Sequence, residues 1–186
     1  MPHPLSNQAP DAEVVARILG GDIEAFGVLV DRYQDSLAQY ATQMTGSPDD
    51  AADVIQESFV RAFRFLRRCD NPANFKGWLF RIVSNQCKSH LSRHARRKTT
   101  TMDDMAALPA PDDPARDVAA EEMRGQVQRA LEELPPDQRE VLVLKYVQDR
   151  NLTEMAELLE VSIPALKMRL LRARTALRGK LQGVVV

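Results

Sequence analysis

One stretch divides this sequence into two parts that are each patterned for helices. Residues 99–117, TTTMDDMAALPAPDDPARD, hold three prolines and, before Pro114, four aspartates, and their apolar residues follow no helical period. Proline removes an amide donor and disrupts a helix interior, so this composition is typical of a linker. About 20 residues can reach roughly 60 Å when extended. The sequence therefore predicts two small helical domains, 10–98 and 118–183, joined by a flexible acidic linker at 99–117.

The composition favours an all-α protein without a membrane span. Helix formers dominate and Gly contributes only 8 of 186 residues. Hydrophobic residues make up 44%, enough for packed cores. No apolar run approaches the roughly 18 residues that a membrane span needs. The first 15 residues lack the pattern of a secretory signal and are expected to form a short disordered lead. The two cysteines, Cys69 and Cys87, form no CxxC motif, which fits a reducing cytoplasm, so we predict a cytoplasmic protein with no membrane insertion.

Start and stop signals place three helices before the linker. Asp22 is expected to cap a helix that ends at Gly46, and Ser47-Pro48 provides a cap and a first-turn proline for the next helix. Apolar residues keep helical spacing through each segment. The three predicted helices are 23–45, 48–68 and 74–97.

The part after the linker is expected to hold four helices, of which the last two form a helix-turn-helix. Pro135-Pro136 ends the first of the four helices. Asn151 or Thr153 can cap the third, and Ser162 the fourth. Two short helices joined by a tight turn, with the second one cationic, are typical of a helix-turn-helix that binds DNA.

Charge is strongly segregated, although the formal net charge is only −1. Residues 61–98 carry eleven Lys and Arg against the single acid Asp70, and no acid follows Glu160. Between these basic blocks, residues 103–122 carry seven acids against the single base Arg116. Two basic blocks separated by an acidic one indicate nucleic-acid contacts at two places.

The last helix is predicted to place apolar groups among its charges. On a helical wheel, Leu166, Leu170, Ala173 and Leu177 share the inner side. Met168 and Leu171 lie on the opposite side. A face that only contacts water rarely carries two large apolar side chains. In a DNA major groove they could contact thymine methyls while arginines reach base edges or phosphates. The alternative is a cationic helix that only solubilises the chain.

The helix at 74–97 also places a large apolar side chain among polar and cationic residues on its outer side. Trp78 lies on its outer side with Asn85 and several cations, a combination that suits nucleic acid because rings stack on bases and amides read base edges. The alternative for Trp78 is that it covers the core from the side.

Metal and enzyme alternatives are weaker. Cys87, His90 and His94 are spaced i, i+3 and i+7 and could hold zinc, but no fourth ligand is evident and the three could simply pack. No phosphate-binding loop, zinc-protease motif or nucleophile elbow is present. We therefore predict no metal, no cofactor and no catalytic residue.

Several segments together resemble a known family, the group 4 (extracytoplasmic-function, ECF) sigma factors of the sigma-70 family. The resemblance covers roughly Val15 to Leu181. It rests on these segments in this order: GDIEAFGVLVDRY, DAADVIQESFVRAFRFL, FKGWLFRIVSNQCKSHLSRHARR, and ALEELPPDQREVLVLKYVQDRNLTEMAELLEVS followed by KMRLLRARTALRGKL.

The resemblance implies a role for each block. Residues 10–98 would be sigma region 2, which binds the polymerase clamp and reads and melts the −10 element. Residues 118–183 would be region 4, which reads the −35 element. The implied partners are core RNA polymerase, promoter DNA (double-stranded at −35, melted at −10) and an anti-sigma factor. The implied polymerase-binding residues are Asp53, Gln56 and Glu57. The implied −10 residues are Asn71, Asn74, Phe75, Lys76, Trp78, Arg81, Asn85, Lys88, Ser89, Ser92, Arg93, Arg96 and Arg97. The implied −35 residues are Pro164, Ala165, Lys167, Met168, Arg169, Leu171, Arg172, Arg174, Thr175 and Arg178.

Two departures from the family pattern concern promoter preference. The recognition helix usually begins Gly-Thr-Val, and here Pro164-Ala165-Leu166 stand in those places. A position that is often Asp is here Ser89.

The rival function is a helix-turn-helix regulator with a sensor or dimerisation domain at 15–97. The basic block at 61–98 argues against the rival, since a sensor domain has no reason to carry it.

Overall fold

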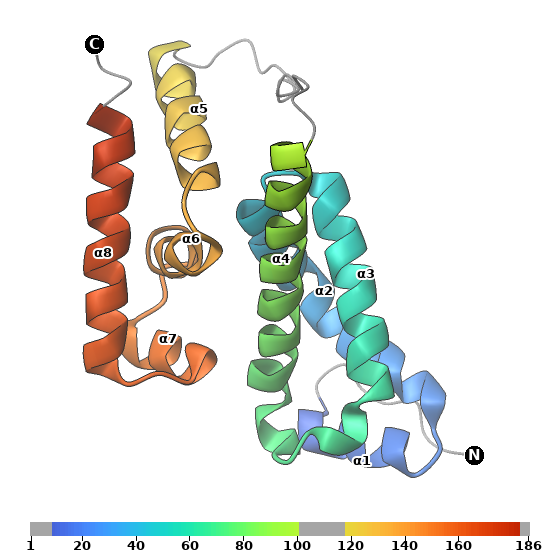
Figure 1. Cartoon of the computed structure of the whole chain (residues 1–186). Coiled ribbons are helices and arrows are strands. Elements are labelled where there is room, and N and C mark those ends of the chain that lie inside the picture. The colour runs from blue at the N-terminus through green and yellow to red at the C-terminus, as the bar shows by residue number, and fades with distance from the viewer. Residues whose placement is uncertain (1–8, 101–117, 183–186) are drawn as a thin grey trace.

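The computed structural model describes residues 9–100 and 118–182, and within these ranges the chain forms helices and turns without a β-strand. Figure 1 shows two groups of helices, α1–α4 and α5–α8, lying side by side. The all-α prediction is confirmed. The elements are α1 (Asp11–Leu19), η1 (Ile23–Ala25), α2 (Phe26–Thr45), α3 (Pro48–Arg64), η2 (Leu66–Arg68), η3 (Pro72–Asn74), α4 (Phe75–Thr100), α5 (Val118–Glu132), α6 (Pro136–Leu142), η4 (Val143–Val147), α7 (Leu152–Leu159) and α8 (Ile163–Gln182).

The junction between α2 and α3 follows the predicted chemistry. Gly46 ends α2 in the left-handed conformation (φ 82°), which glycine adopts without a steric penalty. The Ser47 hydroxyl then accepts a hydrogen bond from the Asp50 amide at 3.3 Å, and Pro48 occupies the first helical position.

The N-terminal expectations need two corrections. Asp22 does not cap a helix, because its carboxylate forms an ion pair with Arg17 and the chain instead enters α2 through the short helix η1. The predicted disordered lead ends earlier than expected, since α1 begins at Asp11. Val14 and Val15 of α1 are buried in the core, which compensates the entropy of ordering this segment.

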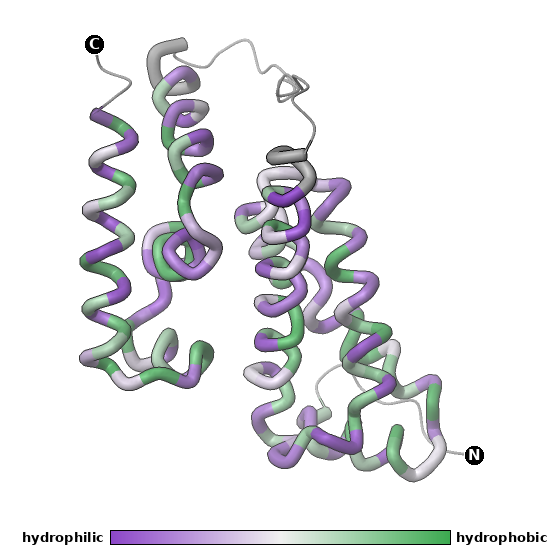
Figure 2. The backbone as a smooth tube through the Cα atoms, in the orientation of Figure 1, coloured by the Kyte–Doolittle hydropathy of each residue, from purple (hydrophilic) through white to green (hydrophobic). Residues whose placement is uncertain are grey.

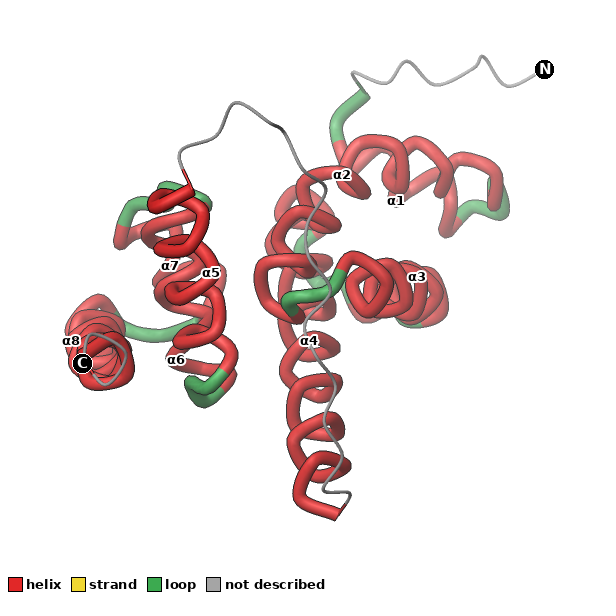
Figure 3. Tube along the Cα trace, turned by 90° about the horizontal axis from the view of Figure 1, so that it is seen from above, coloured by secondary structure: helices red, strands yellow, loops and turns green. Residues whose placement is uncertain are grey.

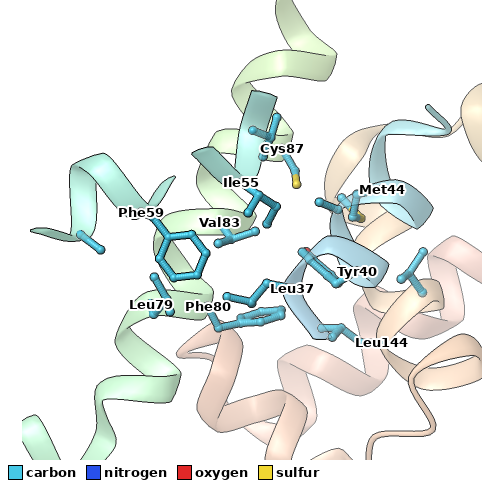
Figure 4. Close-up of a cluster of buried hydrophobic side chains, with 14 of the residues drawn as sticks. Leu37, Tyr40, Met44, Ile55, Phe59, Leu79, Phe80, Val83, Cys87 and Leu144 are labelled. Carbon is cyan, nitrogen blue, oxygen red and sulfur yellow. The ribbon is translucent and has the colours of Figure 1, made fainter. Parts of the chain in front are cut away.

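The core of the first group lies between α2, α3 and α4. Leu79 and Val83 of α4 are almost fully buried against Ile55 and Phe59 of α3 and the apolar face of α2 (Figure 4). Hydrophobic and hydrophilic residues are interspersed along the helices (Figure 2).

The second group packs its helix-turn-helix as the wheel predicts. Leu166, Leu170 and Ala173 are buried, and Met155 of α7 is fully buried beneath them. Asn151 caps α7 with a capping box: its side chain accepts from the Glu154 amide at 2.9 Å, and Glu154 accepts from the Asn151 amide at 3.1 Å.

The two groups of helices share one continuous core. Helix α4 lies between α3 and the second group of helices (Figure 3), where it contacts α6 and α7, and α2 also contacts α6 and η4. Leu144, in the π turn η4, is fully buried and lies near Tyr40 of α2 (Figure 4). Helix α4 also continues to Thr100, past the predicted boundary at Lys98, and residues 101–117 of the predicted linker lie outside the described residues.

The capping box gives a direct test of this local structure. Asn151→Ala removes the acceptor for the Glu154 amide, and we expect it to lower the free energy of unfolding by about 1 kcal/mol. Thr153→Ala is the matched control, because Thr153 is exposed and does not cap the helix. Urea unfolding of both variants measures the difference, and equal losses would argue against the cap.

Candidate nucleic-acid interface

Helix α8 presents a broad cationic face to solvent. All ten residues implied for −35 contact are exposed. Met168 and Leu171 are 50% and 56% exposed, as the wheel requires, while Leu166 on the opposite side is fully buried. The helix begins after Ser162, whose hydroxyl accepts from the Ala165 amide at 3.4 Å. Apolar and cationic groups that stand together on an exposed helix can enter a major groove and meet base edges and phosphates.

The residues implied for −10 contact divide into two sets on α4. Asn85, Ser89, Ser92, Arg93 and Arg96 are exposed. Trp78, Arg81 and Lys88 are partly buried, the last two against the second group of helices. Arg97 lies in α4, but its side chain is outside the described residues.

The connection before α4 and the first turn of α4 place Asn71, Asn74 and Lys76 at the surface. Phe75 differs from them because its ring is fully buried between Tyr33 and Trp78, with ring centroids 6.0 and 5.8 Å away. A buried ring cannot reach DNA in this arrangement, so Phe75 anchors the connection while its neighbours face outward.

Three residues beside this face are missing from the sequence-based set. Phe65, which follows α3, is 37% exposed, with the guanidinium of Arg68 4.9 Å and that of Arg61 5.7 Å from its ring centroid. Together with Trp78 and Asn85 they line a surface depression. Aromatic rings and guanidinium planes are groups on which unstacked bases pack. The spacing Arg-x3-Phe-x2-Arg in the basic block is the signal that could have identified them.

The residues implied for polymerase contact form an acidic exposed strip on α3. Asp53, Gln56 and Glu57 are all exposed. Gln86 of α4 donates to the Glu57 carboxylate at 3.1 Å, which fixes the strip against α4. His90 of α4 lies beside it, with Nε2 3.5 Å from the carboxylate of Asp50.

The possible zinc ligands do not converge. Cys87 is fully buried, whereas His94 is exposed and stacks on His90 with ring centroids 6.4 Å apart. Among the described residues no group of three or more His, Cys, Asp and Glu side chains could hold a metal ion. Helical spacing places the three residues on the same stretch of α4, but their side chains do not meet at a common site.

A buried polar cluster lies between α4 and α6, behind the candidate DNA face. The Glu140 carboxylate of α6 accepts from the Tyr40 hydroxyl at 3.1 Å and from the Ser84 hydroxyl, and it lies 2.6 Å from Lys88 Nζ. Burial and the neighbouring carboxylate raise the pKa of Tyr40 well above its usual value. Burial lowers the pKa of Lys88, but the attraction of Glu140 and Asp137 outweighs this effect and raises it overall, so the lysine stays charged.

These features define an all-α DNA-binding protein with two separate candidate reading faces, one on α4 and one on the recognition helix of a helix-turn-helix. Residues 29–97 match the family model for Sigma-70 region 2, and residues 124–177 match that for Sigma-70, region 4. None of the described helices combines the length and apolar character that crossing a membrane requires.

Curated relatives extend the match to nearly the whole chain. The chain is 32% identical over 190 residues to the ECF RNA polymerase sigma-E factor of Salmonella typhimurium, covering 97% of this chain and 99% of the relative. The corresponding Escherichia coli (strain K12) protein is 31% identical with the same coverage. This chain belongs to the ECF RNA polymerase sigma factors of the sigma-70 family. The rival sensor domain at 15–97 is therefore wrong, since region 2 occupies that place.

Solved structures agree in fold. The structure of CnrH in complex with the cytosolic domain of CnrY is similar with a TM-score of 0.62 and 30% identity, covering 94% of this chain and 99% of that one. The sigma factor RpoE of Bartonella quintana, solved with the anti-sigma factor NepR, matches with a TM-score of 0.61 at 22% identity, covering 84% of this chain and 96% of that one. The second likeness concerns the fold alone.

The thiol of Cys87 provides a test of the buried cluster. Burial, with a contribution from Glu140, raises its pKa from 9.0 to about 12. Above pH 9 the unfolded thiol ionises and the folded one does not, so this group lowers the free energy of unfolding by up to about 1.4 kcal/mol per pH unit until the folded pKa is reached. Comparing urea unfolding of wild type and Cys87→Ala between pH 8 and 10 isolates the effect. A pH-independent difference between the two proteins would contradict it.

Proposed function

We propose that the protein binds core RNA polymerase through the acidic strip Asp53, Gln56 and Glu57 and directs initiation by reading two promoter elements. Helix α8 reads the double-stranded −35 element, and the face of α4 with the preceding connection reads the melted −10 element. The observation that carries the proposal is the exposure of Met168 and Leu171 among the arginines of α8, because apolar groups on a cationic helix fit a base-lined groove.

The division of labour follows the two matched regions. We assign polymerase binding and −10 reading to a domain at 10–98 and −35 reading to a domain at 118–183, with the acidic linker between them. The protein supplies no catalytic residue, cofactor or metal, because the polymerase performs the chemistry. We place it in the cytoplasm, where its polymerase and promoters are found.

A protein inhibitor is part of the proposal. CnrH, which is 30% identical to this chain, was solved with the cytosolic domain of CnrY bound. Exposed apolar side chains, among them Val60, Phe63 and Tyr146, offer contact area to such a partner here. We propose an anti-sigma factor that covers the polymerase-binding and DNA-binding faces.

Run-off transcription tests the central claim. Core polymerase with this protein, on a genomic fragment library, should produce starts that share one −10 and one −35 motif. The variant Asp53→Lys/Glu57→Lys should lose these starts and co-purification with core enzyme. The control variant Asp31→Lys reverses an exposed charge elsewhere and should keep both. Starts no different from those of core enzyme alone would refute the function.

The −35 face predicts different roles for neighbouring residues. Arg172 lies on the outward side of α8, so Arg172→Ala should cost roughly 1–3 kcal/mol on the −35 duplex and relax preference at one position. Arg169 lies on the flank, and Arg169→Ala should weaken all sequences alike and lower the salt slope by about one unit. Fluorescence anisotropy on the duplex and its point mutants at two salt concentrations separates them. Sequence-blind losses in both variants would mean that α8 is only an electrostatic anchor.

A further inference from the structure

A cavity of about 240 Å³ is lined by residues of α2, α4, α7 and the turn before α7. It is far larger than the roughly 10–15 Å³ that a single water molecule needs. It is somewhat smaller than the roughly 300–1,000 Å³ of pockets that hold drug-sized ligands. The cavity therefore has the size for a small organic molecule. Its walls include Tyr33, Leu37, Lys76, Phe80, Arg150 and Leu158.

Aromatic and aliphatic side chains form one side of the cavity. Leu37 and Phe80 are largely buried, and the Phe80 ring packs on Tyr40 with ring centroids 4.7 Å apart (Figure 4). The Tyr33 hydroxyl donates to the Asp11 carboxylate at 2.5 Å, which holds that side chain in place. Because contacts within the fold fix these rings, the apolar wall is formed before a ligand binds. A preformed wall of this kind suits the hydrocarbon part of a ligand.

Arg150 supplies an unused hydrogen-bond donor to the cavity lining. Its Nε is buried and has no hydrogen-bond partner among the described residues. Buried polar atoms are paired in the great majority of cases, so an unpaired N–H beside a cavity indicates an acceptor that enters the cavity. A carboxylate matches best, because it can accept two parallel hydrogen bonds from the planar guanidinium. Lys76 adds a second positive charge to the lining.

Two acids of α7 limit how much negative charge the cavity can accept. Glu154 and Glu157 line the same cavity, and the Glu154 carboxylate is held in the capping box by the Asn151 amide. Like charges repel, so a phosphate, with close to two negative charges, is disfavoured more strongly than a carboxylate with one. The lining therefore favours a head group with a single negative charge.

We propose that this cavity is a binding site for a small monocarboxylate with an aromatic or other apolar body. The carboxylate binds to Arg150, and the charge of Lys76 adds attraction. The hydrocarbon body lies against Leu37, Phe80 and Tyr33. This site is separate from the exposed surfaces assigned to the polymerase and to the −35 element, and it stands whether or not those assignments hold.

Calorimetric titration with three matched probes tests the chemistry of the site. The probes are 3-phenylpropionate, its uncharged amide 3-phenylpropionamide, and phenyl phosphate. We expect saturable binding of the acid at one site per chain, at least about tenfold tighter than the amide, because hydrogen bonds to charged groups are the stronger ones. Phenyl phosphate should also bind more weakly than the acid. The site is refuted if the acid shows no saturable binding up to about 10 mM. Equal binding of acid and amide, or tighter binding of the phosphate, overturns the carboxylate assignment.

A pair of variants tests the role of the guanidinium. Arg150→Gln should weaken binding of the acid at least about tenfold and leave binding of the amide within about twofold. Its melting temperature should not fall, because the Nε that it removes has no partner in the fold. Arg129→Gln makes the same change at an exposed position of α5 and should leave both affinities unchanged. Equal losses in the two variants, or none in Arg150→Gln, would contradict the proposal.

Methyl NMR locates the ligand without any variant. In protein labelled at the leucine methyls, titration with 3-phenylpropionate should shift the signals of Leu37, Leu79 and Leu158, which line the cavity. The signals of Leu171 and Leu177, which line a separate groove on α8, should stay in place. Shifts confined to the groove on α8 would place the ligand elsewhere and overturn the proposal.

Discussion

The buried carboxylate of Glu140 is the constraint on which the arrangement of this molecule depends. It sits in α6, yet its hydroxyl and ammonium partners come from α2 and α4. A charge taken out of water in this way must be compensated by close partners in good geometry. The cluster therefore ties α6, and with it the second group of helices, to α2 and α4. Hydrophobic contact, including that of Leu144, adds area without specifying orientation.

Much of the fold could be predicted from the sequence because local chemistry decides it. Ser47-Pro48 and Gly46 set the junction of two helices, and the apolar period of α8 correctly separates Leu166 from Met168. Asp22 misled the prediction because a nearby arginine competed for its side chain. Helix α1 was missed because Val14 and Val15 are buried by contacts distant in sequence, which no short window reveals.

The candidate site also has features that local sequence predicts and features that depend on contacts distant in sequence. Exposure of the α8 residues follows from helical spacing alone, and it was predictable. The burial of Phe75, the pairing of Arg81 with Glu160 and the exposed ring of Phe65 depend on which helices meet, so only the structure shows them. Lys88 shows the difference best: its place on the outer side of α4 was evident, whereas its carboxylate partners lie about 50 residues further along the chain.

The position of Lys88 and Arg81 between the two groups of helices has a consequence for how such a protein can evolve. A substitution at either position would remove an ion pair between the two groups of helices, so selection at these positions also acts on how the two groups pack. The exposed residues of α8 carry no such double duty in this arrangement. Descendants of this chain should therefore vary more readily at the exposed residues of α8 than at Lys88 and Arg81.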